Sequence, residues 1–275
     1  MAEIDARAAR RAFSRAAPTY LAAARLETEV GKRMLERLDY VRVAPARILD
    51  AGCGPAPQAA ALRRRYRGSR LVALDFALPM LARARAAAGW AARLRRAAPL
   101  VVCAALERLP LAAGSVQLVW SNMALHWAED AGAALAEFRR VLAPEGLLML
   151  STLGPDTLKE LRAAAGAARV HRFADMHDLG DALLAAGFSA PVMDMEQLTL
   201  RYADAGALLA DLRASGQTLA RTDRPRGLAG RGLRAALERS GSSATFEVVY
   251  GHAWKGTPRK TADGRSIVQV NRLSR

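Results

Sequence analysis

The chain has few cysteines, few aromatic residues and no long apolar segment. Only Cys53 and Cys103 among its 275 residues are cysteine, and aromatic residues make up 5%. We expect both to be free, buried thiols in a reducing cytoplasm rather than a disulfide or metal pair. No uninterrupted apolar run approaches the roughly 20 residues of a membrane span, and the acidic, polar residues 1–5 are unlike a signal peptide. We therefore expect a cytoplasmic monomer without a membrane segment or a metal site.

Positive charge is the unusual property of the composition. Lysine and arginine number 41 against 26 acidic residues, which gives a formal net charge of +15. Such an excess indicates an acidic partner or substrate. The length is sufficient for one large α/β domain, or a domain with an insertion, and for a full hydrophobic core.

Apolar strand-like runs alternate with amphipathic helical stretches along the chain. Helical patterns cover residues 58–66, 78–88, 131–141 and 178–186, and residues 143–146 read as a turn. The strand-like runs are 47–51, 70–75, 100–103, 116–121, 147–152, 192–202 and 246–254. This alternation predicts a mostly parallel sheet with helices on both faces. Residues 6–38 form an amphipathic N-terminal region, and 204–240 look helical with a break at 222–232.

Residues 48–56, Ile-Leu-Asp-Ala-Gly-Cys-Gly-Pro-Ala, are the most informative segment. Apolar residues lead into Asp50, and Gly52 and Gly54 follow at alternate positions before a helical stretch. This order predicts a buried strand, a tight glycine turn and a helix, so that a ligand can lie against bare backbone. A second apolar run ends in Asp75, a carboxylate suited to the two hydroxyls of a ribose. Together they predict a nucleoside site.

The glycine spacing separates this site from a dinucleotide site. A dinucleotide fingerprint needs a third glycine where this chain has Pro57. The pattern here, Asp-x-Gly-x-Gly-x-Ala, resembles the first motif of the class I S-adenosylmethionine (SAM) methyltransferases, with Ala56 in place of the usual last glycine. The methionine end of SAM carries an ammonium, a carboxylate and a sulfonium, so an acid beside a glycine turn is useful there.

Ligands of open α/β sheets bind beyond the carboxyl ends of the strands. The second strand supplies Asp75 with Phe76 and Met80 behind it, and the third supplies Leu106 and Glu107. The methyltransferase pattern often has an acid near position 105 for the adenine amino group, but this chain has Ala105, which leaves Glu107 or the backbone to read the base. The fourth strand ends in Asn122, followed by His126 and Trp127. The plainer alternatives are a packing role for Trp127 and a rim position for His126.

A wider resemblance covers most of the chain. The segments that carry it are residues 13–20, 73–75, 78–81, 109–111, 120–122, 126–127, 176–181, 186–188, 191–196 and 250–255. They resemble the malonyl-acyl-carrier-protein O-methyltransferases of biotin synthesis. The resemblance implies a Rossmann-like class I methyltransferase fold with a seven-stranded sheet. It also implies an N-terminal helical lid over 1–45, a methyltransferase domain over 46–255 with a helical insertion at about 203–240, and a basic tail over 256–275.

The resemblance further implies the reaction and its residues. The substrate would be malonate thioesterified to the phosphopantetheine arm of acyl carrier protein, and the product its methyl ester. A carboxylate is already ionised at neutral pH, so no general base is needed, and catalysis is mainly orientation and exclusion of water. Tyr20, His126 and Trp127 are expected on the acceptor side as catalytic residues. The residues expected to bind SAM are Arg15, Asp50, Gly52, Cys53, Gly54, Asp75, Phe76, Met80, Leu106 and Asn122.

The positive charge then has a use, because acyl carrier proteins are acidic and opposite fields speed a transient encounter. The candidate docking residues are Arg7, Arg10, Arg11, Arg213, Arg221, Arg224 and Arg226. A solvated surface charge is the plainer role for each of them singly.

Three alternatives remain open. Proteins with similar segments act as assembly factors for respiratory complex I, so a SAM-binding factor without turnover is one. Another is a methyltransferase for a different small acid or a quinone. A nucleic-acid methyltransferase is disfavoured, because no Asn/Asp-Pro-Pro-Tyr/Phe motif follows the fourth strand and no RNA-binding module is present.

Overall fold

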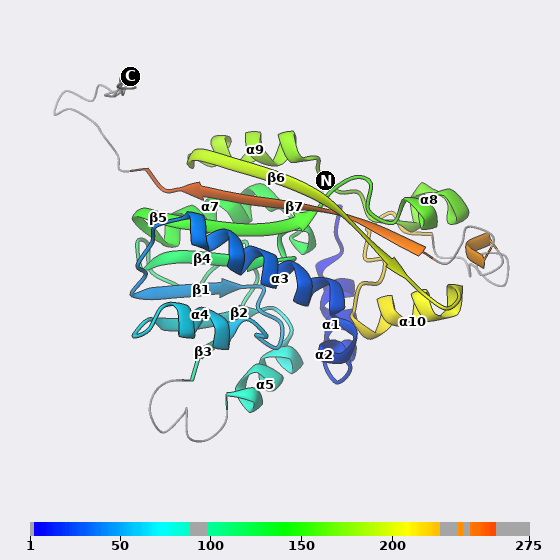
Figure 1. The fold of residues 1–275 in the computed structure, drawn as a ribbon, viewed down its shortest axis with the longest axis horizontal. Helices are drawn as coiled ribbons and strands as arrows, with labels where there is room; N and C mark the ends of the chain where they lie inside the picture. Colours follow the sequence, from blue (N-terminus) through cyan, green and yellow to red (C-terminus); the bar gives the residue numbers. More distant parts are fainter. Residues whose placement is uncertain (1–2, 89–97, 226–235, 239–242, 257–275) are drawn as a thin grey trace.

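A twisted seven-stranded sheet organises the computed structural model, which describes residues 3–88, 98–225, 236–238 and 243–256 (Figure 1). The strand order is β3-β2-β1-β4-β5-β7-β6. Neighbours from β3 to β5 pair in parallel, whereas β7 runs antiparallel to β5 and β6. The strands are β1 (Arg47–Ala51), β2 (Arg70–Asp75), β3 (Leu100–Cys103), β4 (Val116–Asn122), β5 (Leu142–Leu153), β6 (Ser189–Arg201) and β7 (Ser243–Trp254). This confirms the mostly parallel sheet predicted from the alternating pattern.

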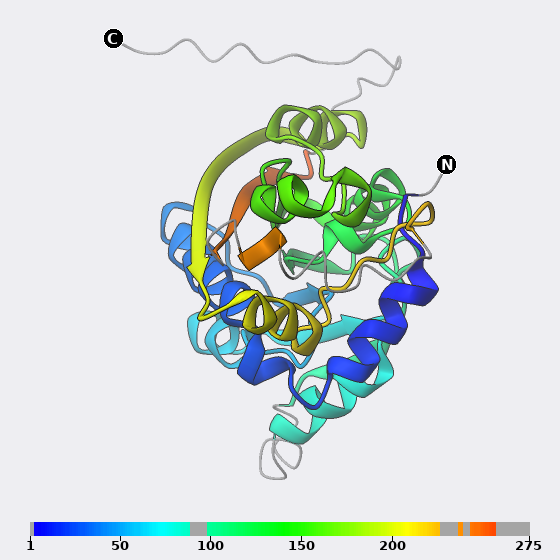
Figure 2. The ribbon, with the colours of Figure 1, turned by 90° about the vertical axis from the view of Figure 1, so that its right-hand side faces the viewer.

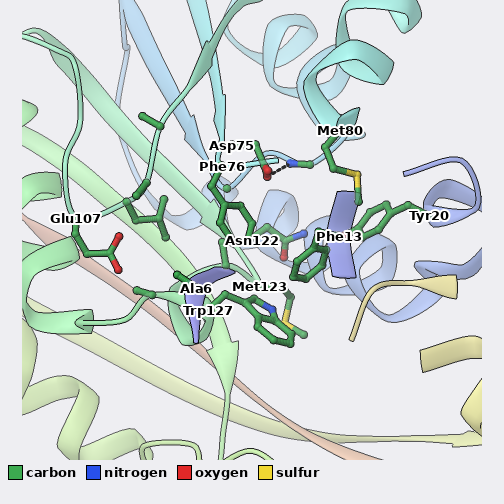
Figure 3. A pocket seen from close by; sticks show the side chains of 17 residues that line it. Ala6, Phe13, Tyr20, Asp75, Phe76, Met80, Glu107, Asn122, Met123 and Trp127 are labelled. Carbon is green, nitrogen blue, oxygen red and sulfur yellow. Dashed lines mark hydrogen bonds between the residues drawn. The ribbon is translucent and has the colours of Figure 1, made fainter. Parts of the chain in front are cut away.

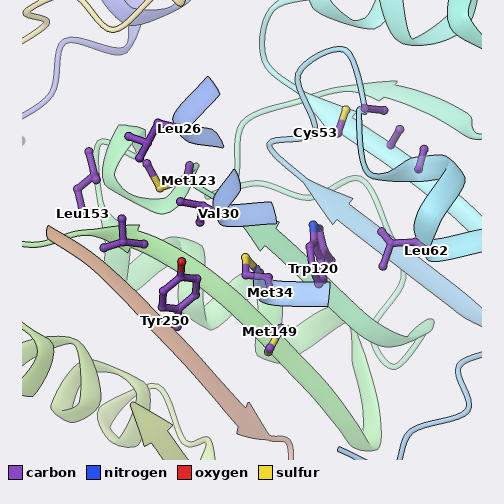
Figure 4. Close-up of a cluster of buried hydrophobic side chains, with 14 of the residues drawn as sticks. Leu26, Val30, Met34, Cys53, Leu62, Trp120, Met123, Met149, Leu153 and Tyr250 are labelled. Carbon is purple, nitrogen blue, oxygen red and sulfur yellow. The ribbon is translucent and has the colours of Figure 1, made fainter. Parts of the chain in front are cut away.

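Helices cover both faces of the sheet, and each face has its own hydrophobic core. One core joins α3 (Arg25–Arg37), α4 (Ala59–Arg65) and α5 (Leu78–Ala87) to the sheet through side chains such as Met34, Leu62 and Trp120 (Figure 4). The other joins α7 (Ala131–Val141) and α9 (Met176–Ala185) through Phe138 and Leu183. Burial of these apolar faces is the main driving force that holds the helices on the sheet.

The helices α1 (Ala6–Ala16), α2 (Tyr20–Ala23), α8 (Lys159–Ala165) and α10 (Ala205–Ala214) gather at the edge where β1, β2 and β4 end. Figure 2 looks toward this edge, with α1 and α10 side by side. Asp5 caps α1 by accepting from the Ala8 N–H, and its own N–H donates to the Ala220 carbonyl. The Thr19 hydroxyl donates to the Ala214 carbonyl. The N-terminal helices are therefore tied to the end of α10 and to the segment that follows it.

Several predicted bounds differ from the structure. The turn predicted over 143–146 lies within β5 as an irregularity, because Val116 pairs with Leu142 but Leu118 pairs with Leu147. The sequence pattern did not predict α8 or the short 3-10 helices Leu38–Tyr40, Leu125–Trp127 and Ala167–Arg169. Within 204–240, α10 is the first helical stretch, and residues 226–235 and 239–242 lie outside the described residues.

The predicted basic tail lies outside the described residues from 257 onward, as does Arg226. The domain boundaries stay predictions. Within the part of the chain that the structure describes, no helix has both the length and the apolarity to cross a membrane.

Candidate functional site

A cavity of about 650 Å³ opens at the carboxyl edge of the strands, beneath α1 (Figure 3). The sequence-predicted residues that line it are Tyr20, Gly52, Gly54, Asp75, Phe76, Met80, Leu106, Asn122 and Trp127. Segments far apart in the sequence therefore meet here, as expected for strand ends of a parallel sheet.

The glycine turn after β1 has the backbone shape that the sequence pattern requires. Gly52 and Gly54 have φ angles of 75° and 55°, in the left-handed region that glycine adopts without strain. A Cβ at Gly52 would lie 2.2 Å from the Ala124 Cβ, so no larger residue fits. A Cβ at Gly54 would lie 3.8 Å from the Tyr20 ring, which means that bare backbone faces this side chain across the cavity.

Two buried carboxyl groups lie at the ends of β1 and β2. The Asp75 oxygens accept hydrogen bonds from the Gly54 N–H (2.9 Å) and the Ala77 N–H (2.7 Å), and burial raises the pKa of Asp75 to about 6. Asp50 Oδ2 is buried without a hydrogen-bond partner among the described residues. Burial, and then the charge of Asp75, raise the pKa of Asp50 to about 8. An unpartnered buried carboxyl beside bare backbone fits a ligand that brings a cationic group.

The side chain of Asn122, at the end of β4, is held by two neighbours. Its amide nitrogen donates to the Glu27 carbonyl (2.9 Å), and its oxygen accepts from the Ser151 hydroxyl (2.9 Å). The next residue, Met123, has a left-handed φ of 54° and donates its N–H to Ser151. The surrounding structure holds Met123 in this strained conformation, as is common for residues that line functional sites.

Glu27 is a buried acid that sequence reasoning missed. Its carboxylate accepts a hydrogen bond from the Gln217 side chain, and burial raises its pKa to about 7. Glu27 belongs to α3 and Gln217 to the segment after α10, 190 positions later. No local pattern predicts a contact over such a separation.

An aromatic wall closes the cavity on the side of α1. The Phe13 ring lies 5.0 Å from Trp127, 5.9 Å from Phe76 and 6.5 Å from Tyr20, between ring centroids. Phe13, another residue that sequence reasoning did not assign to the site, also lines the cavity. Burial first, and then the charge of Glu27, raise the pKa of the Tyr20 phenol well above its usual value, so it is a neutral hydroxyl. Such a wall excludes water from whatever binds beneath it.

Four of the expected site residues do not line the cavity. Arg15 is exposed on α1, and Asp50 and Cys53 are buried in and just after β1. His126 packs behind Trp127, with ring centroids 5.4 Å apart, and its Nδ1 lies 3.2 Å from the Thr152 hydroxyl. Burial lowers the pKa of His126 to about 3, so its imidazole is neutral.

The segment that follows β3 contributes the opposite end of the cavity. In the view of Figure 3, Glu107 lies across the cavity from Tyr20. Its Oε1 accepts hydrogen bonds from the Glu129 and Asp130 N–H groups, which anchors the carboxylate at the wall. Ala105 also lines the cavity. Glu107 thus lines the cavity two positions after Ala105, where the methyltransferase pattern often has an acid.

Comparisons with known proteins agree with this architecture. Residues 49–150 match a family model described as a methyltransferase domain. The chain is 52% identical to a malonyl-[acyl-carrier protein] O-methyltransferase from Methylovorus sp. (strain MP688), over 97% of this chain and 95% of that protein. It is 48% identical to a protein of the same name from Gallionella capsiferriformans, over 98% and 97%.

Solved structures with the same fold are more distant in sequence. The YcgJ protein from Bacillus subtilis aligns with a TM-score of 0.61 and 16% identity, over 82% of this chain and 99% of that one. The [4+2]-cyclase SpnF aligns with a TM-score of 0.53 and 20% identity, over 82% and 80%. Likeness at this level is evidence for the fold alone.

Proposed function

The chain belongs to the family of malonyl-[acyl-carrier protein] O-methyltransferases, and we propose that it methylates the free carboxylate of a malonyl thioester on acyl carrier protein. The observation that carries the proposal is identity of about half the residues over nearly the whole chain. The similarity therefore includes the N-terminal helices and the segment around α10, not only the part shared by methyltransferases of every substrate class. The methyl ester would enter biotin synthesis.

The residues around the cavity fit the cofactor, S-adenosylmethionine. The bare backbone of the glycine turn lines the cavity and suits the methionine end of SAM. The unpartnered Asp50 carboxyl, which is buried in β1 and does not line the cavity, acts on that cationic end through its charge. Asp75 keeps lone pairs for the ribose hydroxyls while Gly54 and Ala77 orient its carboxylate. Phe76, Met80 and Leu106 offer apolar surface for the adenine, and Glu107 offers an acceptor for its amino group. When bound, SAM supplies an electrophilic methyl group.

The protein needs to move no proton in this reaction. A malonyl carboxylate is ionised at neutral pH, so the nucleophile is ready without a general base. A neutral His126 and a neutral Tyr20 agree with a reaction that takes no proton from the substrate. Phe13, Tyr20 and Trp127 exclude water, and Asn122 fixes the wall where methyl group and acceptor would meet.

The arrangement of surface charge supports an acidic partner. Arg7, Arg10 and Arg11 are exposed on α1, as is Arg213 on α10. Arg221 does not fit the docking role expected of it, because only 3% of it is exposed and it pairs with Asp223 and two carbonyls. Arg224 is paired with Asp5. The cytoplasmic location and the monomeric state stay predictions.

Methyl-labelled SAM tests the proposal directly. The purified protein is incubated with malonyl-acyl carrier protein, with malonyl-coenzyme A or with neither, and the ester is detected by mass spectrometry. A carrier-dependent gain of one methyl group is the expected result. SAM binding without transfer to either thioester would instead favour an assembly factor or a different acceptor.

A further inference from the structure

A second cavity, of about 870 Å³, adjoins the cofactor cavity at Trp127. Trp127 lines both cavities. Its ring contacts Phe13, which lines the first, and His171, which lines the second, each with centroids 5.0 Å apart. The indole is thus a shared wall, and a group that reaches its edge from the second cavity is next to the first.

The wall of the second cavity is mainly apolar. It is built where β5 ends, where α8 begins and along α10, and these elements contribute Leu153, Leu158, Leu161, Leu209 and Leu212. A largely apolar lining with a few polar groups is characteristic of sites for small organic ligands.

Two arginines of this cavity have no partner for their charge. Arg169 and Arg213 both line it, and the side chain of neither forms an ion pair or hydrogen bond with the residues that the structure describes. By contrast, the neighbouring Arg221 is fully engaged by Asp223 and by the Ala167 and Val170 carbonyls. Unpaired guanidinium groups beside an apolar wall favour a ligand that is apolar in part and carries an anionic group.

We propose that this second cavity receives the acyl-thioester arm of the acceptor, with Arg169 and Arg213 holding an anionic group of that arm. The inference rests on the proposed function, which requires a thioester substrate whose free carboxylate meets the methyl donor. Trp127, which lines both cavities, provides the meeting point, and the two arginines provide the charge complementarity. The anion is the phosphodiester of the arm, because the malonyl carboxylate has to lie at the methyl donor.

The test compares the double variant Arg169→Ala/Arg213→Ala with Arg64→Ala/Arg67→Ala. The control pair is exposed, lies in and just after α4, and removes the same charge away from both cavities. Affinity for malonyl-acyl carrier protein is measured by calorimetry with S-adenosylhomocysteine present, so that binding is read without turnover. The apo-carrier, which lacks the arm, serves as a second titrant.

We expect Arg169→Ala/Arg213→Ala to weaken malonyl-carrier binding tenfold or more relative to the control pair, with apo-carrier affinity and SAM affinity within twofold. An equal loss for the apo-carrier would overturn the proposal, because the arginines would then contact the carrier surface. Unchanged binding would overturn it as well.

A filling variant, Leu209→Trp, tests the space rather than the charge. It should also weaken malonyl-carrier binding and leave SAM affinity unchanged. If Leu209→Trp does not fold, the titrations of Arg169→Ala/Arg213→Ala alone test the proposal. Failure of the proposed function looks different. If the proposed function is wrong, the wild-type protein forms no methyl ester. If only the cavity assignment is wrong, the wild type forms the ester and Arg169→Ala/Arg213→Ala forms it at the same rate.

Discussion

The surroundings of Asp50 disfavour its ionised form in the protein without a bound cation. Its pKa is raised from 3.8 to about 8, mainly by burial and next by Asp75. The folded protein therefore holds a proton that the unfolded chain releases above its lower pKa. By linkage, this group makes the free energy of unfolding fall as the pH rises from 3.8 to about 8. A bound cationic ligand offsets the free-energy cost of ionising the buried Asp50 carboxyl, because it stabilises the carboxylate.

SAM affinity should thus rise with pH up to about 8, by up to about tenfold per unit where the proton must be displaced. Asp50→Asn should bind SAM more weakly, flatten this dependence and unfold at a higher temperature than the wild type at pH 8 without cofactor. Calorimetric titration at pH 6 and 8 and thermal unfolding provide the measurements. Asp39→Asn, which removes an exposed acid at Arg65, is the control. Equal wild-type affinities at the two pH values would contradict the role given to Asp50.

Sequence reasoning predicted those site residues whose signals are local. Gly52, Gly54, Asp75 and Asn122 follow apolar runs at strand ends, so their positions follow once the strands are predicted. The backbone conformation also accounts for the motif's last position, where this chain has Ala56 in place of the usual glycine. Ala56 has a φ of 56°, in the left-handed region that favours glycine. An alanine tolerates this conformation at a cost of about 1 kcal/mol, so the motif remained recognisable without its last glycine.

The residues that were missed are set by tertiary proximity. Glu27 and Gln217 meet only when α3 and the segment after α10 pack together, and His171 reaches the predicted Trp127 only when the segment after α8 packs against the end of β4. Neither spacing nor composition encodes that packing. Helix α8 was not predicted, because its residues 159–165 show no clear apolar periodicity. The helix packs on the part of β7 that extends beyond β5, a contact that is also set by tertiary structure.

At the scale of elements, the packing of α1 on the segment after α10 shapes the cofactor cavity. Gly216 has a φ of +77°, and a Cβ there would lie 2.8 Å from Phe13 Cδ1. Phe13 in turn lines the cavity and contacts Trp127. A side chain at 216 must therefore displace Phe13, and with it part of the aromatic wall.

Gly216→Ala and Gly68→Ala form a matched pair that isolates this packing. Gly68 has a φ of +86° with nothing within 4 Å of an added Cβ, so both variants carry the same backbone strain of about 1–2 kcal/mol. Gly216→Ala should lose a further 1–3 kcal/mol, roughly, from overpacking, and only this variant should weaken SAM binding. Denaturant unfolding and SAM titration of the two variants measure both effects. Identical behaviour of the pair would mean that Phe13 can move without affecting the cavity.

The whole molecule carries an excess of positive charge that no single contact explains. The described ion pairs satisfy only some of the 41 basic residues, and exposed arginines such as Arg7, Arg10 and Arg11 share one helix at the edge where the substrate must arrive. A net charge of +15 produces a field that extends about 10 Å at 0.1 M salt, far enough to orient an approaching acidic protein. Such steering acts on the rate of encounter more than on the final complex.

Salt should therefore reduce kcat/KM for malonyl-acyl carrier protein by about tenfold or more between low and high ionic strength, with kcat nearly unchanged. SAM affinity, which depends on a buried site, should change little over the same range, because buried charges are screened less than exposed ones. Steady-state kinetics in a salt series measures the first quantity, and calorimetry measures the second. A triple variant Arg7→Gln/Arg10→Gln/Arg11→Gln should show a shallower salt dependence than the wild type. If its slope equalled that of the wild type, the steering field would have to come from another face of the molecule.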